Sequence, residues 1–305
     1  MILPRLFRLG NWVIGALPPR VRYPLAALTG RCVFFFMPAR RRIAYENVAQ
    51  VLGRPADDPL VRRTAGYAFG NYFKMFADFI LMDSLTAEEI RRMVRPNGRE
   101  HIDQALAGGK GAIVVTAHIS NWDILAAASA SYGYPVSAVT DELPLGSLSQ
   151  VVVASRARIG MKMIPLGVSS LRQIIKALGR NELVALASDL ARGDRGVRVN
   201  FFNRPAIFPA GPAAIALKTG VPIIPAWGRR ERDNLYIAEI EAPIEVSRTG
   251  DTAHDIQLTT ERIVAFFERI IRREPDQWLV FLPVWKQEAR TESPGTPAHP
   301  VLESS

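Results

Sequence analysis

Between residues 100 and 240, short apolar runs alternate with longer segments whose apolar positions recur every three or four residues. Runs of this length predict buried strands, and the longer spacing predicts helices that pack on them. The predicted strands are 111–116, 136–140, 161–165, 183–188, 197–202, 221–226 and 235–240. The predicted helices between them are 122–130, 148–159, 170–178 and 211–218. This alternation predicts an α/β fold with a central, mostly parallel sheet flanked by helices.

Helical patterns also precede this region. Residues 40–52 predict a helix that ends at Gly53, and residues 85–94 predict a short helix capped by Thr86. Between them, residues 60–82 predict a longer helix with an aromatic stripe at a three-to-four spacing. The stripe is Phe69, Tyr72, Phe73, Phe76 and Phe79. Packing against the rest of the protein is the simpler interpretation of the stripe, and lining a groove for an acyl chain is the alternative.

The end of the chain divides into a last helix, predicted over 256–271, and a polar tail. Residues 287–305 are rich in Ser, Thr, Pro and Glu, a composition typical of disorder. We therefore expect a basic N-terminal segment over 1–54, an α/β domain over 55–286 and a disordered tail over 287–305.

Composition narrows the class of protein. The chain has 305 residues, of which 48% are hydrophobic and 22% are charged, as in an ordinary globular protein. Its single cysteine, Cys32, excludes an internal disulfide and a zinc site built from cysteines. The net charge of +9 changes the picture more, because residues 1–54 hold nine arginines against one acid, Glu46. A basic segment ahead of a nearly neutral body indicates a polyanionic partner, either nucleic acid or an anionic membrane.

Apolar residues among these arginines favour the membrane. Trp12 and the run 33–37 lie between basic positions, and no nucleic-acid recognition motif is present. Arg20 and Arg31 interrupt every stretch that approaches the roughly 18 apolar residues of a membrane span. We therefore expect a helical segment that lies on the membrane surface, with no nucleic-acid partner. A pair of helices packed on the body, with its arginines in water, is an equally simple alternative.

The candidate chemistry is at residues 116–123, Thr-Ala-His-Ile-Ser-Asn-Trp-Asp. A predicted strand delivers His118 to its carboxyl end, the edge of an α/β sheet where ligands bind. Asp123 follows in the first turn of a predicted helix, from which its carboxylate could hold one imidazole nitrogen. Such a carboxylate would raise the basicity of the other nitrogen, so that His118 could act as a general base. An acid at this spacing also arises by chance about one time in ten. The position of the pair, after a predicted buried strand and before a predicted helix, is therefore stronger evidence than the spacing.

Competing motifs do not fit. Residues 107–111 are glycine-rich but precede their strand, whereas a phosphate-binding loop follows one. No Gly-x-Ser-x-Gly sequence of a serine esterase is present. His101, His254 and His299 have no metal-ligand spacing with His118, so we expect no metal.

The motif around His118 resembles the His-x4-acid signature of the glycerolipid and lipid A acyltransferase superfamily. It is most similar to the lauroyl and myristoyl acyltransferases of lipid A biosynthesis and to phosphatidylinositol mannoside acyltransferases. Further blocks match in order over about residues 40–286. They are 156–160 with 164–166, 188–190 with 196–202, 209–213 with 219–225, and 275–278 (Pro-Asp-Gln-Trp).

The resemblance implies transfer of a fatty acyl chain from acyl-CoA or acyl-carrier-protein to a hydroxyl of a membrane lipid or glycolipid. His118 would be the general base and Asp123 its partner, with no acyl-enzyme and no cofactor. It would place the protein on the cytoplasmic face of the membrane, peripherally, in contact with anionic lipids.

Other matching positions imply substrate contacts. Arg156 and Arg192 would bind a phosphate or an anionic headgroup, although Arg192 is as readily an ordinary solvated or ion-paired side chain. Asn121 would hold the acceptor or, more simply, cap a helix. Asp189 belongs to the acidic motif, where many members have a second acid at the position of Ala187.

Ala187 leaves a second function open, a catalytically silent homologue that binds lipid at the membrane surface. The intact His118 and Asp123 favour catalysis. A third alternative, nucleic-acid binding through the basic segment, predicts a steep salt dependence and no preference for lipid.

Overall fold

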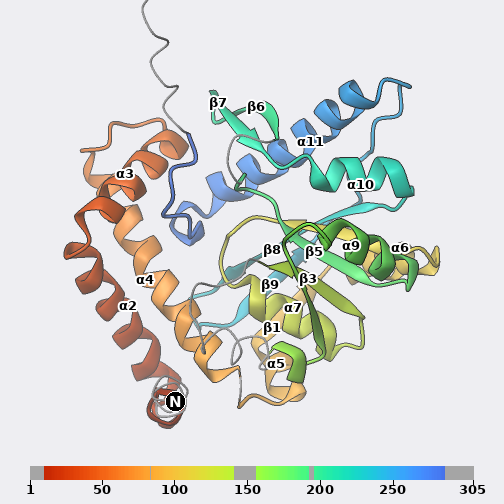
Figure 1. The fold of residues 1–305 in the computed structure, drawn as a ribbon. Coiled ribbons are helices and arrows are strands. Elements are labelled where there is room, and N and C mark those ends of the chain that lie inside the picture. The colour runs from red at the N-terminus through yellow and green to blue at the C-terminus, as the bar shows by residue number, and fades with distance from the viewer. Residues whose placement is uncertain (1–9, 83, 141–155, 192–195, 286–305) are drawn as a thin grey trace, which may run out of the picture.

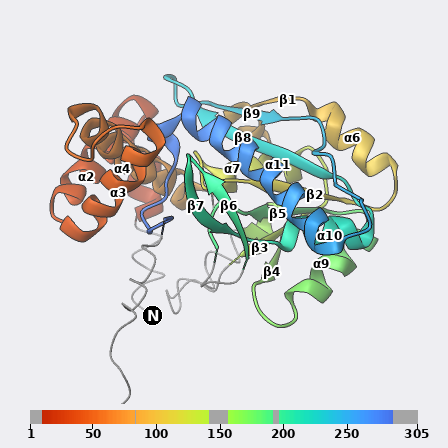
Figure 2. The ribbon, with the colours of Figure 1, turned by 90° about the horizontal axis from the view of Figure 1, so that it is seen from above.

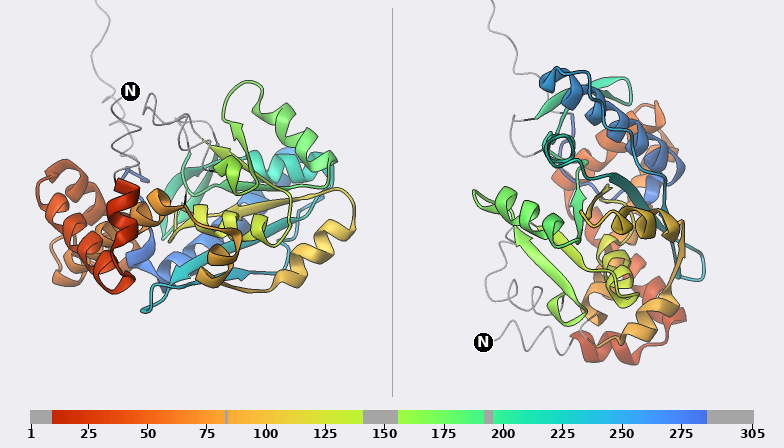
Figure 3. Two further views of the ribbon diagram at one scale, coloured as in Figure 1. Left: turned by 90° about the horizontal axis from the view of Figure 1, so that it is seen from below. Right: turned by 90° about the vertical axis from the view of Figure 1, so that its right-hand side faces the viewer.

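The protein is described by a computed structural model that covers residues 10–82, 84–140, 156–191 and 196–285. A helical layer lies beside an α/β body (Figures 1 and 3). The layer contains α2 (Pro19–Phe35), α3 (Pro38–Leu52) and α4 (Pro59–Leu81). The helices of the body are α5 (Ala87–Met93), α6 (Arg99–Ala107), α7 (Trp122–Ser131), α9 (Ser170–Gly179), α10 (Gly211–Thr219), α11 (Thr252–Arg273) and the 3₁₀ helix η1 (Pro275–Gln277).

The strands form one large sheet and one hairpin. They are β1 (Val94–Asn97), β2 (Ala112–Thr116), β3 (Val136–Thr140), β4 (Met161–Pro165), β5 (Leu183–Ala187), β6 (Val197–Phe201), β7 (Arg204–Phe208), β8 (Ile223–Arg230) and β9 (Tyr236–Ile240). The seven-stranded sheet has the order β1-β9-β8-β2-β5-β3-β4. It is parallel except where β9 runs antiparallel to β8. The predicted α/β fold with a mostly parallel sheet is confirmed.

Helices cover both faces of this sheet (Figure 2). Ile113 and Val115 of β2 pack in the cluster that includes residues of α9, α10 and α11. Ala112 and Val114 of the same strand face the opposite side, in the cluster with Ile102 of α6. Successive residues of a strand point to opposite faces. This alternation explains why strands buried on both sides are apolar throughout.

One predicted strand lies outside the central sheet. β6 pairs with β7 in an antiparallel hairpin, with Phe201 opposite Arg204. The turn residues Phe202 and Asn203 both have positive φ, 50° and 61°. Two left-handed residues form the tight turn that joins antiparallel strands, so this segment cannot continue into a parallel sheet.

Other differences are omissions. The hydrophobic pattern of the sequence did not indicate β1, β7 or α6. Most of the predicted helix 148–159, and all of the predicted disordered tail 287–305, fall outside the described residues.

The helical layer is closely packed. Gly30 of α2 lies against α4, where an added Cβ atom would stand 2.7 Å from the carbonyl oxygen of Phe69. The ring of Phe69 packs against Phe34 of α2 and Phe281, with ring centroids 4.8 and 4.7 Å apart. The aromatic stripe of α4 therefore serves mainly in packing, and the layer continues past residue 54 into α4. Within the described part of the chain, no helix is both long and apolar enough to cross a membrane.

Candidate active site

The loop between β2 and α7 carries His118 at the carboxyl edge of the sheet. β2 ends at Thr116 and α7 begins at Trp122. The side chain of Asn121 caps α7, because its Oδ1 accepts a hydrogen bond from the backbone N–H of Ile124 at 3.1 Å. Of the two roles considered for Asn121, the structure therefore shows capping.

Asp189 is the hydrogen-bond partner of His118. Nδ1 of His118 lies 2.6 Å from Oδ1 of Asp189, and the backbone N–H of His118 donates to Oδ2 at 2.9 Å. The two residues meet because β2 and β5 are parallel neighbours in which Thr116 is paired with Ala187. Each residue follows its paired strand end by two positions. The sheet register therefore places them side by side.

The C-terminal segment closes over this pair. Nε1 of Trp278 donates a hydrogen bond to Oδ2 of Asp189 at 2.9 Å. The backbone N–H of Leu279 donates to the carbonyl of His118 at 2.8 Å, and that of Ser120 donates to the carbonyl of Gln277 at 2.8 Å. Sequence reasoning did not assign a site role to Trp278, although residues 275–278 were among the matching blocks. The segment holds both the histidine loop and the carboxylate that pairs with it.

Asp123 has a different partner from the one predicted. Its carboxylate lies against Arg156, with Nη2 2.7 Å from Oδ1 and 2.9 Å from Oδ2. Both residues are buried, and the guanidinium of Arg156 also lies 5.7 Å from the ring centroid of Phe79. Asp123 is in the first turn of α7, where its side chain meets Arg156, and the position at Nδ1 of His118 is occupied by Asp189. The structure thus corrects the expected pairing and shows Arg156 ion-paired to a carboxylate.

Electrostatics at His118 favour the charged imidazolium. Burial alone would lower the pKa of His118, but the charge and hydrogen bond of Asp189, with a further contribution from the charge of Asp123, raise it above its usual value. Burial would raise the pKa of Asp189, yet His118, Trp278 and the backbone N–H of His118 lower it below its usual value. A buried carboxylate that stays ionised can stabilise a positive charge that forms on His118.

This arrangement suits proton abstraction. Nδ1 of His118 is held by Asp189, so Nε2 is the nitrogen left for a substrate. The side chain is 29% exposed, and its ring meets that of Trp122 edge-on with centroids 4.9 Å apart. A hydroxyl group that reaches Nε2 would find a fixed base with a buried negative partner. Arg192, predicted to bind substrate, lies outside the described residues. In the described part of the chain, no group of three or more His, Cys, Asp or Glu is placed to hold a metal ion.

A buried polar network ties the histidine loop to the helical layer. Oδ1 of Asp78, in α4, accepts a hydrogen bond from the hydroxyl of Tyr23 of α2 at 2.6 Å. Its Oδ2 accepts from Arg230 of β8 and Tyr236 of β9. The Tyr236 hydroxyl also accepts from Nδ2 of Asn121 at 3.2 Å. Nothing in the sequence pattern indicated this network, because its members are far apart in the chain and meet only after folding.

The network makes a stability prediction. Tyr23→Phe should lower the free energy of unfolding by about 1.5–3 kcal/mol, because it removes a hydrogen bond to a buried carboxylate. Urea unfolding at pH 7 measures this change. Tyr67→Phe, at an exposed tyrosine of α4, is the matched control and should change stability by about 0.5 kcal/mol or less. Equal stability of the two variants would contradict the importance of the Tyr23–Asp78 bond.

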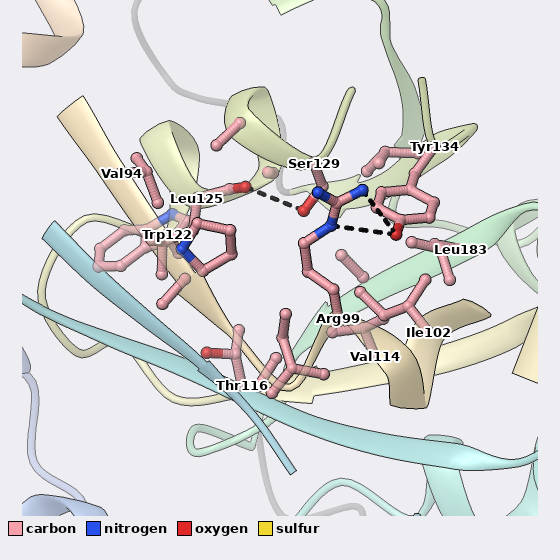
Figure 4. Close-up of a pocket in the computed structure, with 18 of the residues that line it drawn as sticks. Val94, Arg99, Ile102, Val114, Thr116, Trp122, Leu125, Ser129, Tyr134 and Leu183 are labelled. Atoms are coloured by element: carbon pink, nitrogen blue, oxygen red, sulfur yellow. Dashed lines mark hydrogen bonds between the residues drawn. The ribbon is translucent and has the colours of Figure 1, made fainter. Parts of the chain in front are cut away.

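An apolar cavity extends from the histidine loop between the sheet and helices α6 and α7 (Figure 4). Thr116 and Trp122 line it at the end near His118, and Arg99 and Tyr134 line it at the other end. It has a volume of about 90 Å³. The strands contribute small side chains to its wall: Ala185, Ala226 and Ala238. The cavity is narrow and apolar.

Comparisons with known proteins agree on one class of enzyme. The model of the family described as bacterial lipid A biosynthesis acyltransferase matches residues 5–287. Phosphatidylinositol mannoside acyltransferases from two strains of Mycobacterium tuberculosis are each 27% identical over 251 residues, 79% of this chain and 75% of theirs. The enzyme of the same name from Mycolicibacterium smegmatis is 24% identical over 253 residues, 78% of this chain and 77% of its own.

Proposed function

This chain belongs to the bacterial lipid A biosynthesis acyltransferase family, and on that premise we propose that it moves a fatty acyl chain from a thioester donor to a hydroxyl group of a membrane glycolipid. The donor is acyl-CoA or acyl-carrier-protein. The observation that carries the proposal is the His118–Asp189 pair at the carboxyl edge of the sheet. The names of the matched relatives favour a mannosylated inositol lipid as acceptor.

The chemistry follows from the geometry of the pair. Nε2 of His118 takes the proton of the acceptor hydroxyl while its oxygen attacks the thioester carbonyl carbon. Asp189 stabilises the imidazolium that forms and keeps Nδ1 protonated. The carbon–sulfur bond then breaks, the imidazolium returns the proton to the leaving sulfur, and an ester and a free thiol result. The acceptor itself is the nucleophile, so no acyl-enzyme is needed.

The apolar cavity is the proposed site for the acyl chain. It begins at Thr116 and Trp122, which flank the histidine loop, and most of the side chains that line it are apolar. A chain that entered here would hold its carbonyl near His118. The narrow cavity has room for only a few methylene groups, so a longer chain requires the lining side chains to move.

Membrane association is the second part of the proposal. Val21, Leu25, Leu28 and Phe35 of α2 are 48–68% exposed, and their spacing places them on one face of the helix. We call these residues the apolar stripe. An exposed apolar face flanked by arginines is typical of a helix that lies in the membrane interface. We propose that the stripe holds the enzyme peripherally on the cytoplasmic face, where its lipid acceptor is present.

The function is tested directly with purified protein. The protein is incubated with one of two labelled donors, palmitoyl-CoA or palmitoyl-acyl-carrier-protein. Each donor is tested with three acceptors: a phosphatidylinositol mannoside, a lysophospholipid and a lipid A precursor. The expected product is an acylated glycolipid, identified by mass spectrometry. If lipid binds but no acylated product forms with any donor and acceptor, the proposal fails and the chain is a lipid-binding homologue without catalysis.

The cavity makes a specificity prediction. Ala126→Leu adds three carbons to a residue that lines it, and should lower kcat/KM for palmitoyl-CoA about tenfold or more relative to acetyl-CoA, which has no methylene groups to place there. Ala130→Leu, on the same helix but outside the cavity lining, is the matched control. A fall of equal size for both donors would indicate general damage to the fold and contradict this place for the chain.

A further inference from the structure

A second hollow lies in the helical layer, apart from the histidine loop and the apolar cavity. It is an open groove of about 580 Å³ between α2, α3 and α4, and its lining includes Arg31 and Phe35 of α2, Arg41 of α3, and Arg62, Arg63 and Gly66 of α4. We propose that this arginine groove binds the phosphate group of an anionic membrane lipid. The proposal rests on the membrane association proposed above and does not depend on the chemistry at His118.

The charge of the groove is uncompensated. Its lining contains four arginines and no acid. None of the four has a carboxylate partner within the part of the chain that the structure describes. Two other arginines of the helical layer do, since Arg42 pairs with Glu46 at 2.8 Å and Arg54 with Asp58 at 3.0 Å. Guanidinium groups gathered without counter-charges repel one another, and a bound anion relieves that repulsion.

The geometry suits a phosphate. The guanidinium of Arg31 stacks on the ring of Tyr67 at 4.4 Å, and Nη1 of Arg41 donates to the carbonyl of Phe35 at 2.6 Å. These contacts hold two of the arginines in place and leave N–H groups free for a ligand. A guanidinium fork binds phosphate oxygens in a bidentate manner. The groove is concave, which fits a headgroup better than the convex helix of an acidic protein.

The surroundings favour a lipid as the source of the phosphate. Phe35 lines the groove and also ends the apolar stripe of α2. Phe36 beside it is 77% exposed. When the stripe lies in the membrane interface, the groove faces the level of the lipid headgroups. One surface of α2 thus offers apolar side chains to the bilayer and leads to an anion site at its edge.

Gly66 allows the groove to be closed without removing charge. It lies within α4, and an added Cβ atom would meet nothing within 4 Å. Gly66→Leu should therefore fill the groove while the helix keeps its packing, and replacing a helical glycine does not destabilise the helix. The paired variant Arg62→Gln/Arg63→Gln removes charge instead. Arg172→Gln/Lys176→Gln on α9 is its charge-matched control, at the end of the molecule opposite the helical layer (Figure 2).

The experiment is co-sedimentation with vesicles of phosphatidylcholine with or without phosphatidic acid. Gly66→Leu and Arg62→Gln/Arg63→Gln should each weaken binding to the anionic vesicles by about tenfold or more, and the α9 variant should change it less than threefold. Acyl transfer by the unmodified protein to a detergent-solubilised acceptor is measured in parallel. That assay tests the proposed catalysis without vesicles, so its failure can be told apart from undiminished vesicle binding by the groove variants.

Three outcomes would overturn the assignment. Undiminished vesicle binding by Gly66→Leu would mean that the arginines attract the anionic membrane surface as a whole and that the groove binds no individual phosphate group. If the groove variants bind vesicles normally but have a raised KM for acylated acyl-carrier-protein and not for acyl-CoA, the groove is a docking site for the carrier protein. Calorimetric binding of inorganic phosphate as tight as that of the vesicles, with the same sensitivity to Gly66→Leu, would indicate a soluble phosphate ligand.

Discussion

Replacing His118 with glutamine should lower kcat for acyl transfer by about 10²–10⁴-fold, the usual contribution of a general base. Glutamine has a similar reach but cannot take up a proton at neutral pH. The KM for the donor should change little, because the acyl chain is placed in a cavity that His118 does not line. Steady-state kinetics with purified enzyme measure both constants.

The control for this variant is His254→Gln. His254 is exposed on α11, so its replacement should leave kcat within twofold of the native value. Thermal unfolding of both variants shows whether the fold is kept. Undiminished kcat in His118→Gln, with normal stability, would refute the proposed mechanism.

Replacing Asp189 with asparagine should lower kcat by about 10²-fold or more. This is the effect expected when a carboxylate that orients a catalytic histidine and stabilises its imidazolium form is lost. Asparagine lacks the negative charge, and its single amide oxygen cannot replace both Oδ1, which faces Nδ1 of His118, and Oδ2, which accepts from Trp278 and the backbone N–H of His118. That charge raises the pKa of His118 and stabilises the imidazolium formed during transfer. A rate measured from pH 5 to pH 9 tests both effects.

The direction of the pH shift is set by the same charge. The base is active when His118 is neutral, so the rate of the native enzyme rises as pH passes upward through its raised pKa. Without the charge of Asp189 the pKa falls, and the acidic limb of the profile should move to lower pH. Asp123→Asn is the comparison, because Asp123 acts on His118 only through a smaller coulombic effect. A larger shift in Asp123→Asn than in Asp189→Asn would contradict the pairing that the structure shows.

Local patterns predicted most of the elements. Apolar runs gave the strands β3 and β4 with their observed limits, and Thr86 and Glu89 form the predicted capping box at the start of α5. The hairpin of β6 and β7 was missed because its turn uses Phe202, a residue that rarely adopts positive φ. Strand 94–97 was missed because it is short and contains a proline, which strand patterns disfavour.

Within the site, the sequence determined which residue could act as the base and where it would lie. His118 follows an apolar strand and precedes a capped helix, and both features are local. The choice of its carboxylate depended on tertiary structure. Asp123 is five residues away and Asp189 is far along the chain, yet Asp189 is the partner because β2 and β5 are neighbours in the sheet. Strand order is a long-range property that hydrophobic periodicity does not encode. For the same reason only the folded chain brings together Tyr23, Asp78 and Arg230, or gathers the four arginines of the groove.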